Sequence, residues 1–267
     1  MTGKLIKHEL RCYWKTFLPL WGAMLVLAVI NGLTFRGVGN FFSQGVPMLV
    51  FGSVVLATCV LTLVVVLQRY YQGLLGNEGY LVFTLPVSRG QIMTAKLLSA
   101  VLVELLSLLT AASSGALLAI IATRSKIEGL SLFFDMLKVT FEDMPKESWM
   151  SVLLVIELIL MGIFAAAQRT LHMYAAMSLG HLAKKQRIAL SVVAYVGINV
   201  AETQLLMWLI KAAGKLDLSF PWDYSDFASS LSSMCGSMAI VLGLELISCA
   251  ALWAVSQYIL EKKLNLD

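Results

Sequence analysis

Charged residues are scarce in this sequence: Lys, Arg, Asp and Glu together make up only 13% of its 267 residues. A water-soluble domain contains about 25% charged residues, so an ordinary soluble fold is excluded. Hydrophobic residues make up 59% instead, and the mean hydropathy is +0.82. Long apolar runs of this kind are typical of membrane helices, so the composition predicts an all-α integral membrane protein.

Motifs for enzymatic chemistry are also missing. The sequence has no His-Glu-x-x-His, no Gly-x-Ser-x-Gly, no pair of aspartates at phosphate-handling spacing, and no glycine-rich phosphate loop ending in Lys-Ser/Thr. We therefore expect no catalytic residue, no cofactor bound by this chain, and no ATP hydrolysis by this chain alone. No basic patch with interleaved aromatic residues indicates a nucleic-acid partner either.

Histidine and cysteine are few and scattered. The three histidines, His8, His172 and His181, are expected near the inner face of the membrane without forming a cluster. The cysteines have no metal-ligand spacing, and we interpret them as small buried hydrophobes. They are Cys12, Cys59, Cys235 and Cys249. No metal site is therefore expected.

Six apolar runs are long enough to cross a hydrocarbon core of about 30 Å. The predicted spans are 18–35, 46–67, 97–123, 149–167, 188–210 and 234–260. They form a single transmembrane domain, residues 1–267. The third helix is expected to begin near Arg89, and residues 168–180 to continue the fourth helix.

The distribution of positive charge predicts the orientation of the six spans. Thirteen of the 20 lysines and arginines lie in the segments on the same side as the N-terminus. Positively charged residues concentrate on the cytosolic side of membrane proteins, so both ends of the chain are expected inside. Residues 124–148 then form a mixed-charge outer loop with a short amphipathic helix, and residues 211–233 form a second outer connection.

Residues 2–16 have the pattern of an amphipathic helix. The apolar arc of the helical wheel contains Ile6, Leu10, Tyr13, Trp14 and Phe17, and the basic arc contains Lys4, Lys7, His8, Arg11 and Lys15. Such a helix lies at the membrane interface with its basic side toward anionic headgroups. The alternative is that these residues are only the start of the first span.

The segment 70–88, between the second and third spans, is too polar to cross a bilayer. Its aromatic residues indicate that it packs against another part of the protein. They are Tyr70, Tyr71, Tyr80 and Phe83. The segment is therefore expected to lie on the cytosolic face as an ordered connection.

Within this connection, residues 76–85 are predicted to form a short helix along the membrane surface. Pro86 ends it, because proline lacks a backbone donor and disfavours helical geometry in the preceding residue. Ser88 and Gln91 have the spacing of a capping box for the next helix. A short transverse helix of this kind is suited to contact with a soluble motor protein.

One glutamate lies in each of the last four spans. They are Glu104, Glu157, Glu202 and Glu245, on helical stripes that also include Gln168, His172, Asn199 and Ser248. Charged groups at this depth are costly, so they indicate either a substrate path or proton-coupled site, or hydrogen bonding between helices. The estimated depths differ: Glu104 lies toward the inside, Glu245 near the middle, and the other two toward the outside. We favour the structural interpretation for this reason.

Three stretches of the sequence resemble permease subunits of bacterial ABC-2 type transporters. The first is Lys4–Leu10, the second is Asn77–Ser88 running into Lys96-Leu97, and the third is Tyr174–Gly180 followed by a basic turn and Ser191–Tyr195. In such permeases the connection between the second and third spans is the coupling helix, which lies in a groove of the ATPase. The N-terminal helix is the elbow helix beside it.

The resemblance implies a complex of two ATPase subunits and two permease chains, identical or paralogous, in the bacterial cytoplasmic membrane. ATP and Mg²⁺ would bind to the ATPase subunits. The complex would export a hydrophobic or amphipathic compound, such as an antimicrobial peptide, a drug or a lipid-like molecule. The alternative function is a non-transporting membrane scaffold or sensor that docks a cytosolic regulatory protein.

The resemblance also implies which residues contact the ATPase. They are Asn77, Glu78, Gly79, Tyr80, Phe83, Thr84, Leu85, Pro86, Val87 and Arg89. Glu78 would link the coupling helix to a cation on the elbow helix or the ATPase, and Arg11 is the candidate on the elbow helix. The alternative is that Glu78 is a solvated surface acid.

Overall fold

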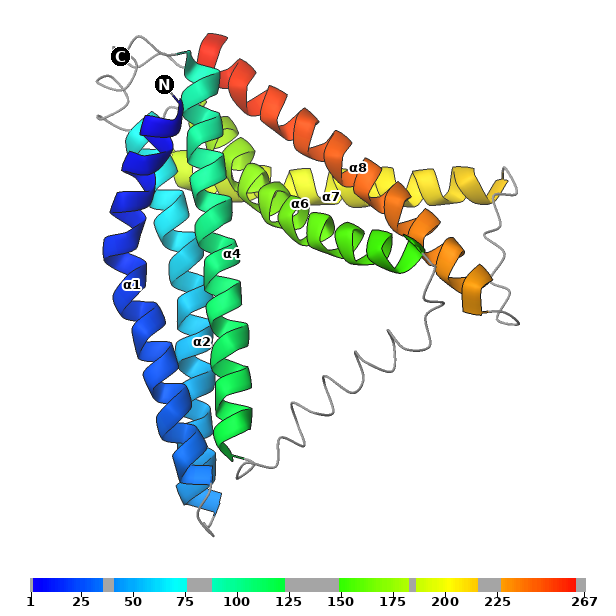
Figure 1. Cartoon of the computed structure of the whole chain (residues 1–267). Helices are drawn as coiled ribbons and strands as arrows, with labels where there is room; N and C mark the ends of the chain where they lie inside the picture. Colours follow the sequence, from blue (N-terminus) through cyan, green and yellow to red (C-terminus); the bar gives the residue numbers. More distant parts are fainter. Residues whose placement is uncertain are drawn as a thin grey trace. The chain divides into compact units, whose positions relative to one another are not determined.

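The computed structural model describes residues 2–35, 41–75, 88–122, 149–182, 186–215 and 227–262, and these residues contain helices and no strand. The helices are α1 (Thr2–Phe35), α2 (Phe41–Tyr70), the π-helical turn η1 (Tyr71–Leu75), α4 (Arg89–Ala122), α6 (Trp149–Gly180), α7 (Arg187–Lys215) and α8 (Phe227–Lys262) (Figure 1). The all-helical fold class is thereby confirmed for the described residues.

The six α-helices are long and apolar enough to cross a membrane. Large apolar side chains remain exposed along them, for example Leu56 at 66%, Val193 at 64% and Ile247 at 68%. A soluble protein rarely leaves so many of these side chains in water, whereas lipid is a favourable environment for them. The six predicted spans are confirmed in number within the described residues, and they suggest a multi-pass membrane protein.

The first helix differs from the sequence-based expectation. α1 is continuous from Thr2 to Phe35, with Pro19 inside it, so no break separates an elbow helix 2–16 from a span 18–35. The two arcs of its first half are partly confirmed: the five basic-arc residues are exposed, while Tyr13 and Phe17 are buried at 2% and 0% exposure. Trp14, which belongs to the same predicted apolar arc, is instead exposed at 47%. The separate elbow helix is therefore not confirmed.

Other boundaries agree with the prediction in part. α4 begins at Arg89, and Ser88 caps it: the backbone N–H of Gln91 lies 3.4 Å from Ser88 Oγ and 3.0 Å from the Ser88 carbonyl oxygen. α6 continues unbroken to Gly180, as expected. α7 extends to Lys215 and α8 begins at Phe227, so both helices continue into the predicted outer connection 211–233. The predicted helices at 76–85 and within 124–148 lie outside the described residues.

The chain forms two compact units. The first comprises residues 1–66 and 98–146. Buried polar groups connect its helices: Trp21 Nε1 donates to Ser107 Oγ at 3.1 Å, and Thr62 Oγ1 lies 3.5 Å from the same hydroxyl oxygen. α1 also approaches α4 closely at Gly32, where an added Cβ would lie 2.7 Å from the Cβ of Ile121. These contacts hold α1, α2 and α4 side by side.

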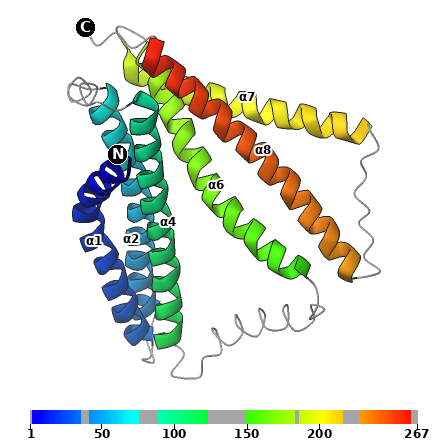
Figure 2. The ribbon, with the colours of Figure 1, turned by 45° about the horizontal axis from the view of Figure 1, so that its top comes forward.

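The second unit comprises residues 67–97 and 147–267, and α6 packs against both α7 and α8 within it. α7 runs antiparallel to α6: Gln168 meets Glu202, while Gly180, twelve residues later, meets Ser191. α8 runs parallel to α6, since Glu157 lies near Cys235, while Gln168, eleven residues later, meets Ser248. The end of α6, the start of α7 and the end of α8 thus converge (Figure 2).

The close approach at Gly32 generates a prediction for the first unit. Gly32→Ala should destabilise the protein by about 1–3 kcal/mol, because the new methyl group overlaps Ile121 in a packed contact. The matched control is Gly22→Ala in the same helix, where nothing lies within 4 Å of the added Cβ. Alanine favours a helix over glycine by about 1 kcal/mol, so the control should be neutral or stabilising.

Thermal unfolding of the purified variants in the same detergent measures both effects. Equal stability of the Gly32 and Gly22 variants would contradict the packing of α1 against α4.

Candidate functional site

Tyr70, the last residue of α2, packs closely against α6. Its ring stacks on Tyr174 of α6 with 3.8 Å between ring centroids and 15° between ring planes. Its hydroxyl group lies 2.7 Å from Ser178 Oγ, one turn further along α6. All three side chains are buried, so the chain is held against α6 just before the predicted coupling helix begins.

The π-helical turn that follows Tyr70 passes close to the start of α4. An added Cβ at Gly73 would lie 2.6 Å from Lys96 Nζ, so a larger residue there would require the end of the lysine side chain to shift. Lys96 is buried at 7% exposure, and its ammonium group lies 3.4 Å from the carbonyl oxygen of Arg69. The ammonium group of Lys96 on α4 thus lies beside the carboxyl-terminal end of α2.

The other flank of the segment is held by α8. Arg89, the first residue of α4, donates from its guanidinium group to the carbonyl oxygen of Leu260 at 2.5 Å. A helix end leaves its last carbonyl groups without partners inside the helix, so an arginine is well suited to this position. Gly90 lies against the side-chain amide of Gln257, one turn before Leu260. The residues on both sides of 76–87 therefore contact the converging ends of α6 and α8.

The turn between α6 and α7 depends on Gly180. A Cβ at this position would overlap the hydroxyl group of Ser191 and lie 2.8 Å from the carbonyl oxygen of Arg187. Glycine thus allows the end of α6 to touch the first turn of α7. His181 follows, with its ring 6.1 Å from that of Tyr71 and its Nε2 3.3 Å from the guanidinium group of Arg187.

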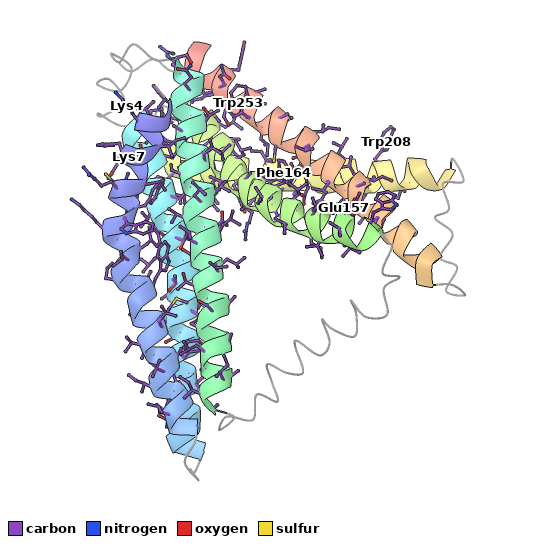
Figure 3. All side chains as sticks on the ribbon, in the orientation of Figure 1. Lys4, Lys7, Glu157, Phe164, Trp208 and Trp253 are labelled. Atoms are coloured by element: carbon purple, nitrogen blue, oxygen red, sulfur yellow. The ribbon has the colours of Figure 1, made fainter. Side chains whose placement is uncertain are left out.

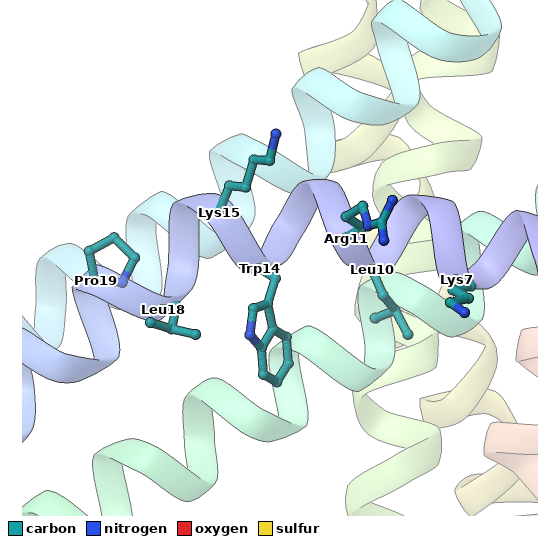
Figure 4. A pocket seen from close by; sticks show the side chains of 7 residues that line it. All are labelled: Lys7, Leu10, Arg11, Trp14, Lys15, Leu18 and Pro19. Atoms are coloured by element: carbon teal, nitrogen blue, oxygen red, sulfur yellow. The ribbon is translucent and has the colours of Figure 1, made fainter.

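Arg11 lies on α1 in the first unit, on the rim of a shallow hollow (Figure 4). The hollow is lined by Lys7, Leu10, Arg11, Trp14, Lys15, Leu18 and Pro19. Leu10, Trp14 and Leu18 are four residues apart, so they form one apolar stripe beside the cations. This mixed surface suits the interface between lipid headgroups and acyl chains. The predicted pair of Arg11 with Glu78 stays a prediction, because Glu78 lies outside the described residues.

The predicted coupling-helix residues are only partly described. Arg89 is described, and the other nine lie outside the described residues: Asn77, Glu78, Gly79, Tyr80, Phe83, Thr84, Leu85, Pro86 and Val87. Their contact with a partner stays a prediction. Sequence analysis identified Tyr70 as a residue that must pack, but it did not identify Tyr174 and Ser178 as the partners.

A cluster of polar side chains lies between α6, α7 and α8. We call Gln168, His172, Glu202 and Ser248 the polar cluster. Ser248 donates its hydroxyl proton to Glu202 Oε1, and Gln168 Nε2 lies 3.4 Å from Glu202 Oε2 and 3.3 Å from Ser248 Oγ. His172 Nε2 lies 2.8 Å from Glu202 Oε2. The predicted stripes on three helices thus meet at one place.

The glutamates of the last four spans have different surroundings. Glu202 on α7 contacts Gln168 on α6 and accepts a hydrogen bond from Ser248 on α8, and its role stays a prediction. Glu157 on α6 (Figure 3) and Glu245 on α8 each have one carboxylate oxygen that is buried without a hydrogen-bond partner among the described residues. Glu104 is half-buried on α4 in the first unit. The three glutamates of the second unit therefore differ in their hydrogen-bond partners.

Two expectations about the polar residues are corrected. His172 was expected near the inner face and Glu202 toward the outer face, but their side chains are 2.8 Å apart and share one depth. A membrane depth estimated by counting residues along a span is correct only when the helices cross the membrane without tilt and in register with one another. Asn199, a candidate for contact between helices, donates its amide to the Tyr195 carbonyl oxygen of its own helix at 2.9 Å, and the contact between helices stays a prediction.

No group of three or more His, Cys, Asp and Glu side chains is placed to hold a metal ion among the described residues. Comparisons of the chain with protein-family models, with curated proteins and with solved structures returned no match.

The contact between Tyr70 and Ser178 can be tested by a double-mutant cycle. Tyr70→Phe and Ser178→Ala should each destabilise the protein by about 1–3 kcal/mol, because each leaves one buried hydroxyl group without its partner. The double variant should lose less than the sum of the two, since both partners are then removed. Unfolding of the four proteins in the same detergent gives the coupling free energy. Strictly additive losses would exclude the hydrogen bond.

Proposed function

We propose that this chain is the membrane-spanning permease subunit of an ABC-2 type exporter. The observation that carries the proposal is that both flanks of the segment 76–87 contact the converging ends of α6 and α8. Tyr70 holds the first flank on α6, and Arg89 holds the second on α8. The six apolar helices supply the membrane-spanning part that such a subunit requires.

These two contacts give the segment the mechanical role expected of a coupling helix. Energetic coupling passes through packed side chains and hydrogen bonds, so a displacement of 76–87 would reach α6 through Tyr70 and α8 through Arg89. The stacked, buried Tyr70 cannot shift without also moving Tyr174. A freely hanging connection would absorb the displacement instead. The contacts therefore support a connection through which a cytosolic motor moves membrane helices.

In the proposed complex, two ATPase subunits bind ATP and Mg²⁺ below the membrane, and closure of the ATPases pushes on the coupling helices. The exposed apolar side chains of the six helices suit contact with lipid and with a second permease chain, identical or paralogous. The predicted outer segments contain no large domain that would capture a substrate from outside. We therefore assign the direction as export, with a hydrophobic or amphipathic compound as the substrate class.

The coupling role predicts a separation of ATP hydrolysis from transport. Glu78→Ala and Arg11→Ala should each lower export of an amphipathic peptide about tenfold, a loss of about 1.4 kcal/mol in coupling, while ATP hydrolysis continues. The permease is purified with its co-purifying ATPase and placed in proteoliposomes, where both activities are measured.

The matched control for Glu78→Ala is Glu128→Ala, which removes the same charge from the predicted outer loop and should change neither activity. If both Glu78→Ala and Arg11→Ala export the peptide normally, the proposed linkage is wrong. If no nucleotide-binding protein co-purifies with the wild-type chain, the scaffold or sensor is favoured instead.

The contact surface of the coupling helix generates a second prediction. Phe83→Asp and Leu85→Asp should each prevent the ATPase from co-purifying, because an unpaired carboxylate buried in an interface costs about 3–5 kcal/mol. The controls Phe83→Leu and Leu85→Met keep an apolar side chain and should retain the partner. Quantitative pull-down in mild detergent measures the bound ATPase. Unchanged binding by both aspartate variants would exclude these residues from the interface.

A further inference from the structure

Both ring nitrogens of His172 face oxygen acceptors. Nδ1 lies 2.9 Å from the carbonyl oxygen of Gln168, and Nε2 lies 2.8 Å from Glu202 Oε2. The approach of Nε2 to the carboxylate is close but not aligned as a hydrogen bond. The side chain of His172 is 8% exposed and that of Glu202 is 30% exposed. Water therefore has little access to the imidazole, while one side of the carboxylate remains open.

A neutral imidazole cannot satisfy this arrangement. It has one N–H group and one nitrogen lone pair, so one of its two nitrogens would point a lone pair at an oxygen acceptor. An imidazolium has two N–H groups and faces both acceptors favourably. The two contacts of the ring therefore favour an imidazole that bears both N–H groups.

The donors around Glu202 decide where the second of these protons resides. Ser248 Oγ donates to Oε1, and Gln168 Nε2 lies within 3.4 Å of Oε2. Hydrogen bonds donated to a carboxylate favour its charged form. The extra proton is thus held by His172 as an imidazolium, and the two side chains form an ion pair without net charge.

Other titratable groups lie on the three helices that surround His172. On α8, Cys249 is close enough to interact electrostatically with both Glu202 and Glu245. On α6, Glu157 is buried at 8% exposure, and Arg169 is exposed on the same helix as His172. On α7, the ring of Tyr195 lies edge-on to His172 at 6.4 Å. Apart from Arg169, these groups are neutral or acidic, so they do not repel the imidazolium.

We propose that His172 and Glu202 form a membrane-embedded binding site for one proton, and that this proton holds α7 against α6 and α8. With the proton bound, Ser248, Glu202 and His172 link the three helices into one neutral network. Without it, a net negative charge remains among apolar helices, where charge is costly. Separation of α7 from α6 would open the site and release the proton through the half-exposed Glu202.

The protonation state can be observed without any transport assay. Full-length protein containing nitrogen-15 histidine is placed in lipid nanodiscs, and NMR reports which ring nitrogens bear a proton at neutral pH. His172→Gln assigns the His172 signals by their disappearance. An ordinary histidine has a pKa of about 6.5 and is mostly neutral at this pH. We expect both ring nitrogens of His172 to be protonated.

Two variants test the role of Glu202. Glu202→Gln keeps the shape but removes the charge, and should return His172 to a single N–H. Ser248→Ala removes one donor to Glu202 and leaves both members of the ion pair in place. It should lower the fraction of doubly protonated His172 by a smaller amount than Glu202→Gln does. This variant provides the test if Glu202→Gln does not fold. The matched control is Glu104→Gln in the first unit, which should leave the His172 signals unchanged.

Hydrogen–deuterium exchange of the same proteins tests the link to helix packing. Backbone amides of α7 should exchange at least about tenfold faster in Glu202→Gln than in wild type, a difference of about 1.4 kcal/mol in opening. A singly protonated His172 in the wild-type protein would overturn the proton site. Unchanged exchange of α7 in a variant that has lost the second N–H would overturn its role in holding the helices.

Discussion

The structure depends on the small number of polar contacts that the described helices make with one another. Lipid solvates an apolar side chain as well as another helix does, so apolar contact alone gives little preference for one arrangement of membrane helices. Hydrogen bonds and close approaches at small residues provide that preference. Here these are Trp21 with Ser107 and Gly32 with Ile121 in the first unit, and Tyr70 with Ser178 and the polar cluster in the second.

Within the second unit, α6 takes part in both of the sites that we propose. Tyr174 and Ser178, near its end, hold the flank of the coupling segment. Gln168 and His172, one to two turns earlier, belong to the polar cluster. A rigid helix transmits displacement along its axis, so a force applied at Tyr174 would also act on the contact between His172 and Glu202. In the proposed transporter the two sites would therefore respond to the same movement.

Much of the helical fold could be predicted from the sequence, whereas the partners of its polar residues could not. The start of α4 at Arg89 followed from the Ser88 cap, and the continuation of α6 to Gly180 followed from its composition. The predicted break after residue 16 is absent, because no residue there prevents the helix from continuing into Pro19. Tyr70 was expected to pack against something, but the stacking on Tyr174 depends on a contact between residues 104 positions apart.

The sequence by itself determined that the chain has six long apolar helices and that their few polar residues lie on defined stripes. Hydropathy and helical periodicity are local properties, so they can be read from neighbouring residues. Only the tertiary structure decided which stripes meet: it brought His172 and Glu202 to one depth and left the Asn199 amide bonded to its own helix. The reason is that the tilt and register of packed helices depend on all their contacts together, and no single stretch of sequence specifies them.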